Sequence, residues 1–147
     1  AYSNAIKEID SSIEIFEKAC PLFVPIAEEG WTHHRATYEI AEEYLKELRE
    51  KDIDTLVLGC THYPILADVI QEVIGKDVKL IDSGIATAEV VRNEINRIGF
   101  ETNSAVPGNL EVYVSDIPTT FKSVAELFLG RTINDVVKVD IEDLHKI

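Results

Sequence analysis

The chain has 147 residues, enough for one hydrophobic core or for parts of two, and its 46% hydrophobic and 28% charged residues are typical of a globular protein. Its 27 acidic residues outnumber 14 basic ones, and the net charge of −13 opposes binding to nucleic acid or to an anionic membrane surface. A long apolar run and a secretory signal are both lacking, so we expect a cytoplasmic protein without a membrane partner.

The first fifty residues predict helices around one short strand. Ile6 and Ile9 have helical spacing, which predicts a helix over residues 1–9. The run of Ile13, Ile15 and Phe16 then predicts a strand. A short apolar segment follows at residues 22–29, broken by a proline and closed by a glycine, and residues 37–50 have the apolar spacing of an amphipathic helix.

The rest of the chain alternates strands with helices. Thr55–Leu58 is the aliphatic run expected of a strand buried on both faces, and a helix begins at Pro64, so residues 60–62 form a strand-to-helix turn. Further strands are predicted at residues 78–81, 110–114 and 136–141, helices at 87–98 and 119–129, a turn at 82–84, and a loop at 101–109. This alternation predicts an α/β fold with a parallel sheet, whose ligands bind at the carboxyl ends of the strands.

The predicted turn after Thr55–Leu58 carries Cys60, Thr61 and His62. Backbone N–H groups of the turn and the Thr61 hydroxyl can bind a carboxylate, and a helix start with a neighbouring imidazole favours the thiolate of Cys60. His62 can assist Cys60 or protonate a substrate group. From residue types alone, an equally good interpretation is that Cys60 is a small buried hydrophobe and His62 a surface or capping residue.

Three motifs carry a resemblance to a known family. LGCTHYPIL at residues 58–66, ACPLFVPIAEEG at 19–30 and LIDSGIATAEVV at 80–91 occur in the order and spacing of the glutamate racemases. The likeness extends from residue 1 to about residue 100 and resembles the C-terminal half of that family. His62 and the Tyr-Pro after it distinguish the motif from that of the related aspartate racemases.

The resemblance implies roles for particular residues. Cys60 matches the second catalytic cysteine of the family, Thr61 its carboxylate-binding threonine, His62 its active-site histidine and Glu28 its auxiliary acid. An alternative for Glu28 is a solvated pair of acids with the neighbouring glutamate. Cys20 matches a cysteine that is not catalytic, so we expect a structural thiol there. Neither cysteine has metal-ligand spacing, and we expect free thiols, no metal and no organic cofactor.

The family implies an architecture that this sequence covers only in part. Its members racemise glutamate without a cofactor, using two thiols from two pseudo-symmetric α/β domains, and supply D-glutamate for peptidoglycan precursors. We therefore expect the N-terminal part of the fold to be absent, residues 1–81 to belong to one α/β domain, and residues 82–147 to complete the second. The resemblance also implies a homodimer in the complete enzyme.

Two other functions remain open on the sequence. The chain could be another racemase of the superfamily, acting on aspartate or a hydantoin, although His62 favours glutamate. It could also be a catalytically silent fragment that keeps a carboxylate pocket, because removing the α-proton from one face and returning it to the other requires two acid–base groups. Activity of the isolated 147-residue chain is therefore doubtful.

Overall fold

The computed structural model describes residues 2–102, 104–106, 108–116, 121–134 and 136–142. The chain divides into two compact units, residues 1–93 and residues 94–147. Each is described separately below. In the described ranges no helix is both long and apolar enough to cross a membrane.

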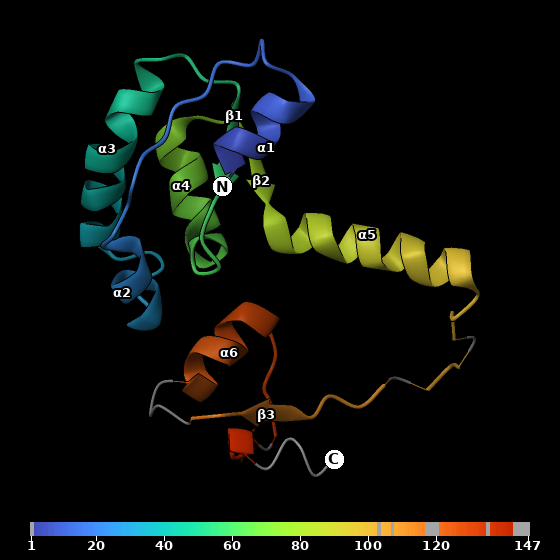
Figure 1. Ribbon diagram of the computed structural model, residues 1–147. Helices are drawn as coiled ribbons and strands as arrows, with labels where there is room; N and C mark the ends of the chain where they lie inside the picture. The colour runs from blue at the N-terminus through green and yellow to red at the C-terminus, as the bar shows by residue number, and fades with distance from the viewer. Residues whose placement is uncertain (1, 103, 107, 117–120, 135, 143–147) are drawn as a thin grey trace. The chain divides into compact units, whose positions relative to one another are not determined.

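The first unit is built from helices and a parallel pair of strands (Figure 1). In chain order its elements are α1 (Tyr2–Ile9), α2 (Phe23–Glu28), α3 (Arg35–Arg49), β1 (Thr55–Leu58), the 3-10 helix η1 (Tyr63–Leu66), α4 (Ala67–Ile74), β2 (Lys79–Asp82) and the start of α5 (Ser83–Ile98). The helices that the apolar pattern predicts in this part are present, and so are the strands predicted at Thr55–Leu58 and at residues 78–81. The strand expected at Ile13 is absent from the described structure.

Strands β1 and β2 pair in parallel, with Leu58 opposite Asp82. Both strands therefore end at the same edge of the sheet, where ligands of parallel α/β sheets bind. The crossover between them is η1 with α4, and Gln71 holds its end in place. The Gln71 side-chain amide donates to the carbonyl oxygens of Gly75 at 2.8 Å and Val78 at 3.0 Å.

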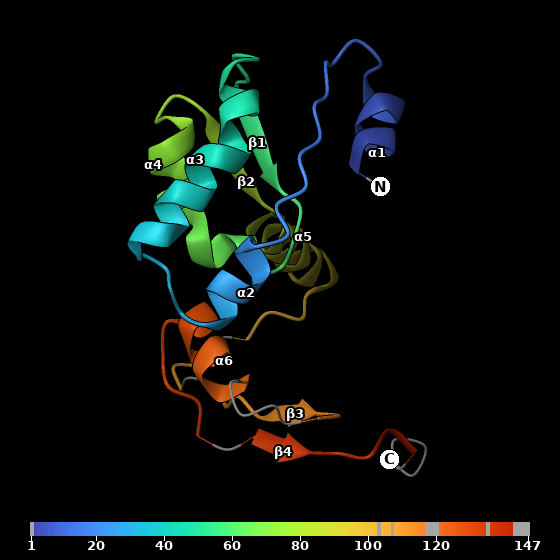
Figure 2. The ribbon, with the colours of Figure 1, turned by 90° about the vertical axis from the view of Figure 1, so that its left-hand side faces the viewer.

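The core of the first unit lies between the sheet and helices α3 and α4. Figure 2 shows these two helices on one side of β1 and β2, and α1 on the other side. Leu58, Leu66, Val69 and Ile70 are at most 3% exposed and form the centre of the core. Thr37 is also fully buried, and its hydroxyl donates to the Trp31 carbonyl at 2.6 Å, which satisfies the one polar group that α3 brings into the core.

The strand predicted at Ile13, Ile15 and Phe16 is wrong. This stretch is extended but unpaired: within the described part of the chain, residues 14–19 make no backbone–backbone hydrogen bond. A strand is defined by its backbone hydrogen bonds to an adjacent strand, and an alternating apolar run forms none of these bonds where no adjacent strand is present.

Two helix boundaries also differ from the sequence prediction. In the apolar segment predicted at residues 22–29, helix α2 (Phe23–Glu28) continues past Pro25, because a proline in the first turn sacrifices no intrahelical hydrogen bond. Helix α5 begins at Ser83 instead of residue 87, and the predicted turn is its first turn. Asp82 causes this early start, since its carboxylate accepts the N–H groups of Gly84 at 2.7 Å and Ile85 at 3.4 Å.

In its described residues the second unit contains the end of α5, another parallel pair of strands and the helix α6. Its elements after α5 are β3 (Val112–Val114), α6 (Phe121–Leu129) and β4 (Val136–Lys138). Ile133 is 4% exposed, and its N–H donates to the Glu126 carboxylate at 3.0 Å. The α/β fold class with parallel strands is thus confirmed in both units.

Candidate active site

The structure places Cys60, Thr61 and His62 in the turn between β1 and η1, as the sequence predicts. Two backbone hydrogen bonds shape this turn: Tyr63 N–H donates to the Cys60 carbonyl at 3.2 Å, and Ile65 N–H to the His62 carbonyl at 3.1 Å. Cys60 is half-buried and Thr61 is exposed. The thiol therefore lies at the carboxyl end of a strand with a solvent-accessible hydroxyl next to it.

His62 connects Thr61 with Glu28. The Thr61 hydroxyl lies 3.4 Å from His62 Nδ1, and His62 Nε2 lies 3.5 Å from a carboxylate oxygen of Glu28. Both distances are long for strong hydrogen bonds, so the chain Thr61–His62–Glu28 is loosely held. The structure thus brings together Glu28 and His62, which are more than thirty positions apart in the sequence, and all three residues of this chain are among those that the motifs indicate.

Tyr63 joins the two segments that carry these residues, a contact that its place in the motif does not indicate. Its hydroxyl donates to the Cys20 carbonyl at 3.1 Å, and its ring meets Phe23 of α2 edge-to-face with centroids 5.4 Å apart. On the other side of Phe23, Tyr44 packs edge-to-face at 5.4 Å. An aromatic residue beside a histidine is an ordinary core residue by type, and only the structure shows that Tyr63 fixes α2 against the turn.

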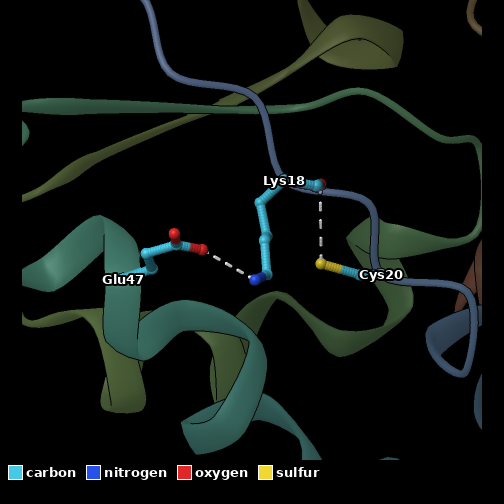
Figure 3. Close-up of polar contacts among 3 residues, drawn as sticks. All are labelled: Lys18, Cys20 and Glu47. Carbon is cyan, nitrogen blue, oxygen red and sulfur yellow. Dashed lines mark hydrogen bonds and ion pairs between the residues drawn. The ribbon is translucent and has the colours of Figure 1, made fainter.

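Cys20 lies in the core and has the properties of a structural thiol. It is 5% exposed, and burial raises its pKa to about 11, although the charge of Lys18 opposes this rise. Its thiol faces the Lys18 carbonyl at 3.7 Å, while the Lys18 ammonium pairs with Glu47 at 2.8 Å (Figure 3). Cys20 is therefore almost entirely protonated at neutral pH, unlike a catalytic base.

The site is suited to acid–base chemistry on a small acid. A thiol, an imidazole and a carboxylate stand beside an exposed hydroxyl and the N–H groups of a turn, which together can bind a carboxylate and move a proton near it. In the described residues no three His, Cys, Asp or Glu side chains gather as a metal site would require.

The structure is an α/β unit with a thiol and an imidazole after a parallel strand, and comparison with known proteins identifies the family. Residues 1–91 match the model described as Asp/Glu/Hydantoin racemase. This match covers more than half of the 147 residues, and the chain belongs to the Asp/Glu/hydantoin racemase family.

Its curated relatives and solved neighbours include glutamate racemases. The chain is 46% identical to the glutamate racemase of Geobacter metallireducens over 97% of its own length and 53% of the relative's length. It is similar to the Francisella tularensis glutamate racemase solved with D-glutamate (TM-score 0.85, 33% identity, 97% of this chain, 53% of that chain). A Thermus thermophilus glutamate racemase in complex with beta-chloro-D-alanine matches with TM-score 0.74 and 36% identity over 86% of this chain and 48% of that one.

These similarities confirm the resemblance that the three motifs indicate. The chain spans about half the length of the curated relatives it matches.

Proposed function

We propose that the chain carries one half of the active site of a glutamate racemase, which interconverts L- and D-glutamate without a cofactor. The observation that carries this proposal is the arrangement of Cys60 at the end of a parallel strand, with Thr61, His62 and Glu28 linked beside it. The similarity to glutamate racemases, one of them solved with D-glutamate, supports glutamate as the substrate.

In the proposed mechanism, Thr61 and the N–H groups of the turn bind the substrate α-carboxylate. The Cys60 thiolate takes the α-proton from one face, and a thiol on the opposite face returns a proton to the carbanion. In the reverse direction Cys60 is the acid. His62 assists proton transfer in the site, and Glu28 orients the imidazole from a distance of 3.5 Å.

A second acid–base group is essential to this mechanism, and Cys20 does not fit that role, because its thiol is buried and its pKa is raised to about 11. We assign the second group to a part of the protein outside residues 1–147. The 147-residue chain by itself is then a carboxylate-binding half-site without racemase activity, which is the second candidate function.

The proposal extends to domain organisation. We propose that residues 1–81 belong to one α/β domain and that residues 82–147 complete another. Support comes from α5, which has no buried residue. Its apolar side chains Ile85, Val90 and Val91 are 50–67% exposed. An apolar helix without a core partner in its own unit is expected to pack on another part of the protein.

The biological setting follows from the same reaction. We propose that the protein acts in the cytoplasm as a homodimer and supplies D-glutamate to peptidoglycan precursors. Substrate is its small-molecule partner, and the net charge of −13 opposes binding to nucleic acid.

A version of the protein spanning the full length of the curated relatives tests the function. Circular dichroism follows racemisation of D-glutamate, with L-aspartate as the competing substrate. Cys60→Ala is expected to lower kcat at least about 100-fold, the usual contribution of a positioned acid–base group. Cys20→Ala is the matched control and should keep most of the activity if it folds. Full activity of Cys60→Ala, or a preference for aspartate, would refute the proposal.

A further inference from the structure

The carboxylate of Glu28 is held in the site by the backbone that carries it. Glu28 is the last residue of α2, its side chain is 51% exposed, and its carboxylate lies 3.5 Å from His62 Nε2. Packing does not fix a half-exposed side chain, so the position of the carboxylate depends on the end of α2. The edge-to-face contacts of Tyr63 and Tyr44 with Phe23 hold the start of this helix and not its end.

The end of α2 is closed by a Schellman motif. The Trp31 N–H donates to the Ile26 carbonyl at 3.1 Å. The Gly30 N–H donates to the Ala27 carbonyl, also at 3.1 Å. Gly30 supplies the left-handed residue that this motif requires, with a φ of 71°. These bonds fix the backbone around Glu28 relative to the loop that follows it.

Thr37 joins this motif to α3. Its side chain is fully buried in the first turn of α3, and its hydroxyl donates to the Trp31 carbonyl at 2.6 Å. Trp31 is therefore bonded to both helices, to α2 through its N–H and to α3 through its carbonyl; Figure 2 shows the loop between them. The Trp31 ring also lies on the ring of His34, the N-cap residue of α3, with centroids 4.5 Å apart.

Helix α3 gives this bond a firm support. Ala41, Leu45 and Leu48 on α3 are at most 6% exposed and belong to the core. Apolar packing is non-directional, so the buried residues of α2 keep that helix on the core without specifying the direction of its last turn. A hydrogen bond is directional, and the bond from Thr37 therefore sets the position of Trp31 relative to α3.

We propose that Thr37 is a positioning residue of the active site, whose hydroxyl holds the Trp31 turn and thereby keeps the Glu28 carboxylate beside His62. This inference rests on the proposed function, in which Glu28 orients the imidazole. Thr37 is buried and acts only through the turn. Without its hydroxyl the end of α2 moves, and the contact of 3.5 Å between Glu28 and His62, already long for a strong hydrogen bond, is lost or weakened.

Thr37→Val in a version of the protein spanning the relatives' full length tests this inference, because valine has the shape of threonine without the hydroxyl. The imidazole chemical shifts of His62 should move towards those of Glu28→Gln. The kcat for racemisation should fall roughly 10-fold, less than the roughly 100-fold that a displacement of about 1 Å can cost. KM should stay the same, because Thr61 and the N–H groups of its turn bind the substrate carboxylate in the proposed mechanism.

Two further variants separate positioning from a general loss of stability. Thr37→Ser keeps the hydroxyl and should restore both the His62 shifts and kcat. Ile74→Val removes a methyl group from a core residue that is 6% exposed, at the end of α4 far from the Cys60 turn. It should leave the His62 shifts and kcat unchanged.

Gly30 offers a second route that leaves the core intact. It is exposed, and in the described structure no heavy atom beyond its chain neighbours lies within 4 Å of the place of a Cβ. A side chain there meets only the strain of the positive φ, which asparagine tolerates and β-branched residues avoid. Gly30→Val should therefore act on His62 and kcat as Thr37→Val does, and Gly30→Asn should resemble the unchanged protein.

Three results would overturn the inference. The first is unchanged His62 shifts and kcat in Thr37→Val, or in Gly30→Val if Thr37→Val does not fold. The second is the same changes in Ile74→Val, and the third is failure of Thr37→Ser to restore them. If Glu28→Gln leaves His62 and kcat unchanged, the positioning role falls, while Cys60→Ala still decides the proposed function, so the two failures are distinguishable.

Discussion

The two cysteines show how position determines the chemistry of the same side chain. Cys60 is half-buried after β1, whereas Cys20 is 5% exposed and has a pKa raised to about 11 by burial. In the sequence only the motifs distinguish the two, because residue type alone left Cys60 as either a reactive thiol or a small hydrophobe. The burial of Cys20, and the rise in its pKa that burial causes, follow from contacts with residues distant in the sequence, which a local sequence pattern does not reveal.

The first prediction is that iodoacetamide modifies Cys60 faster than Cys20 in the folded protein. The rise in pKa from 9.0 to about 11 lowers the thiolate fraction of Cys20 on the order of 100-fold near pH 8, and burial also blocks access to it. Peptide mapping by mass spectrometry after timed labelling measures both rates. In denaturant the two rates should converge, and faster labelling of Cys20 in the folded chain would contradict the assignment.

The second prediction concerns Tyr63→Phe. Losing the hydroxyl that donates to the Cys20 carbonyl should cost about 1 kcal/mol of unfolding free energy, the usual value for one hydrogen bond. It should also loosen α2, and with it Glu28, from the turn. We therefore expect the NMR chemical shifts of the His62 imidazole, which lies 3.5 Å from the Glu28 carboxylate, to move towards those of the Glu28→Gln variant.

Tyr44→Phe is the matched control for this prediction. Its hydroxyl accepts the Leu22 N–H at 3.3 Å, and its ring packs on Phe23 as Tyr63 does, so a similar loss of stability is expected. Tyr44 does not follow His62 in the turn, and its variant should leave the imidazole chemical shifts of His62 unchanged. Equal effects of both variants on His62 would mean that Tyr63 has only a structural role.

At the scale of elements, apolar periodicity predicted most of the fold. Helix Arg35–Arg49 buries Leu45 and Leu48 as its spacing indicates. Strand Thr55–Leu58 is present, but of its residues only Leu58 is buried, whereas the sequence predicted burial on both faces. The failure at Ile13, Ile15 and Phe16 has a physical cause, because a strand depends on a neighbour in space and the pattern carries no information about whether that neighbour is present.

The third prediction is that Asp82 is responsible for the early start of α5. Asp82→Ala should remove the acceptor for the Gly84 and Ile85 N–H groups and destabilise the first turn by about 1 kcal/mol. Amide exchange of Gly84 and Ile85 should become faster as a result. Asp82→Asn keeps an acceptor oxygen and should restore most of the protection. If alanine and asparagine behave alike, the cap is not what starts the helix.

At the scale of the whole molecule, the proposed racemisation needs two acid–base groups on opposite sides of one carbon, and this requirement limits what the sequence can predict about the site. The motifs located Cys60, Thr61, His62 and Glu28, and the structure brings them together. No residue pattern could place the second acid–base group, because that requires the arrangement of two half-sites in space. The relatives, of which this chain spans about half, indicate where such a group would come from.

The last prediction is that the 147-residue chain alone does not racemise glutamate, whereas a version spanning the relatives' full length does. A single thiol can remove the α-proton but returns it to the face from which it came, so the configuration is retained. With L-glutamate in D₂O, the short chain should therefore show no change in circular dichroism, even if NMR detects slow entry of deuterium at the α-carbon. The longer protein should show both together, and Cys60→Ala should remove both. Inversion by the short chain would place the second group within residues 1–147, and Cys20→Ala would then be the first variant to examine.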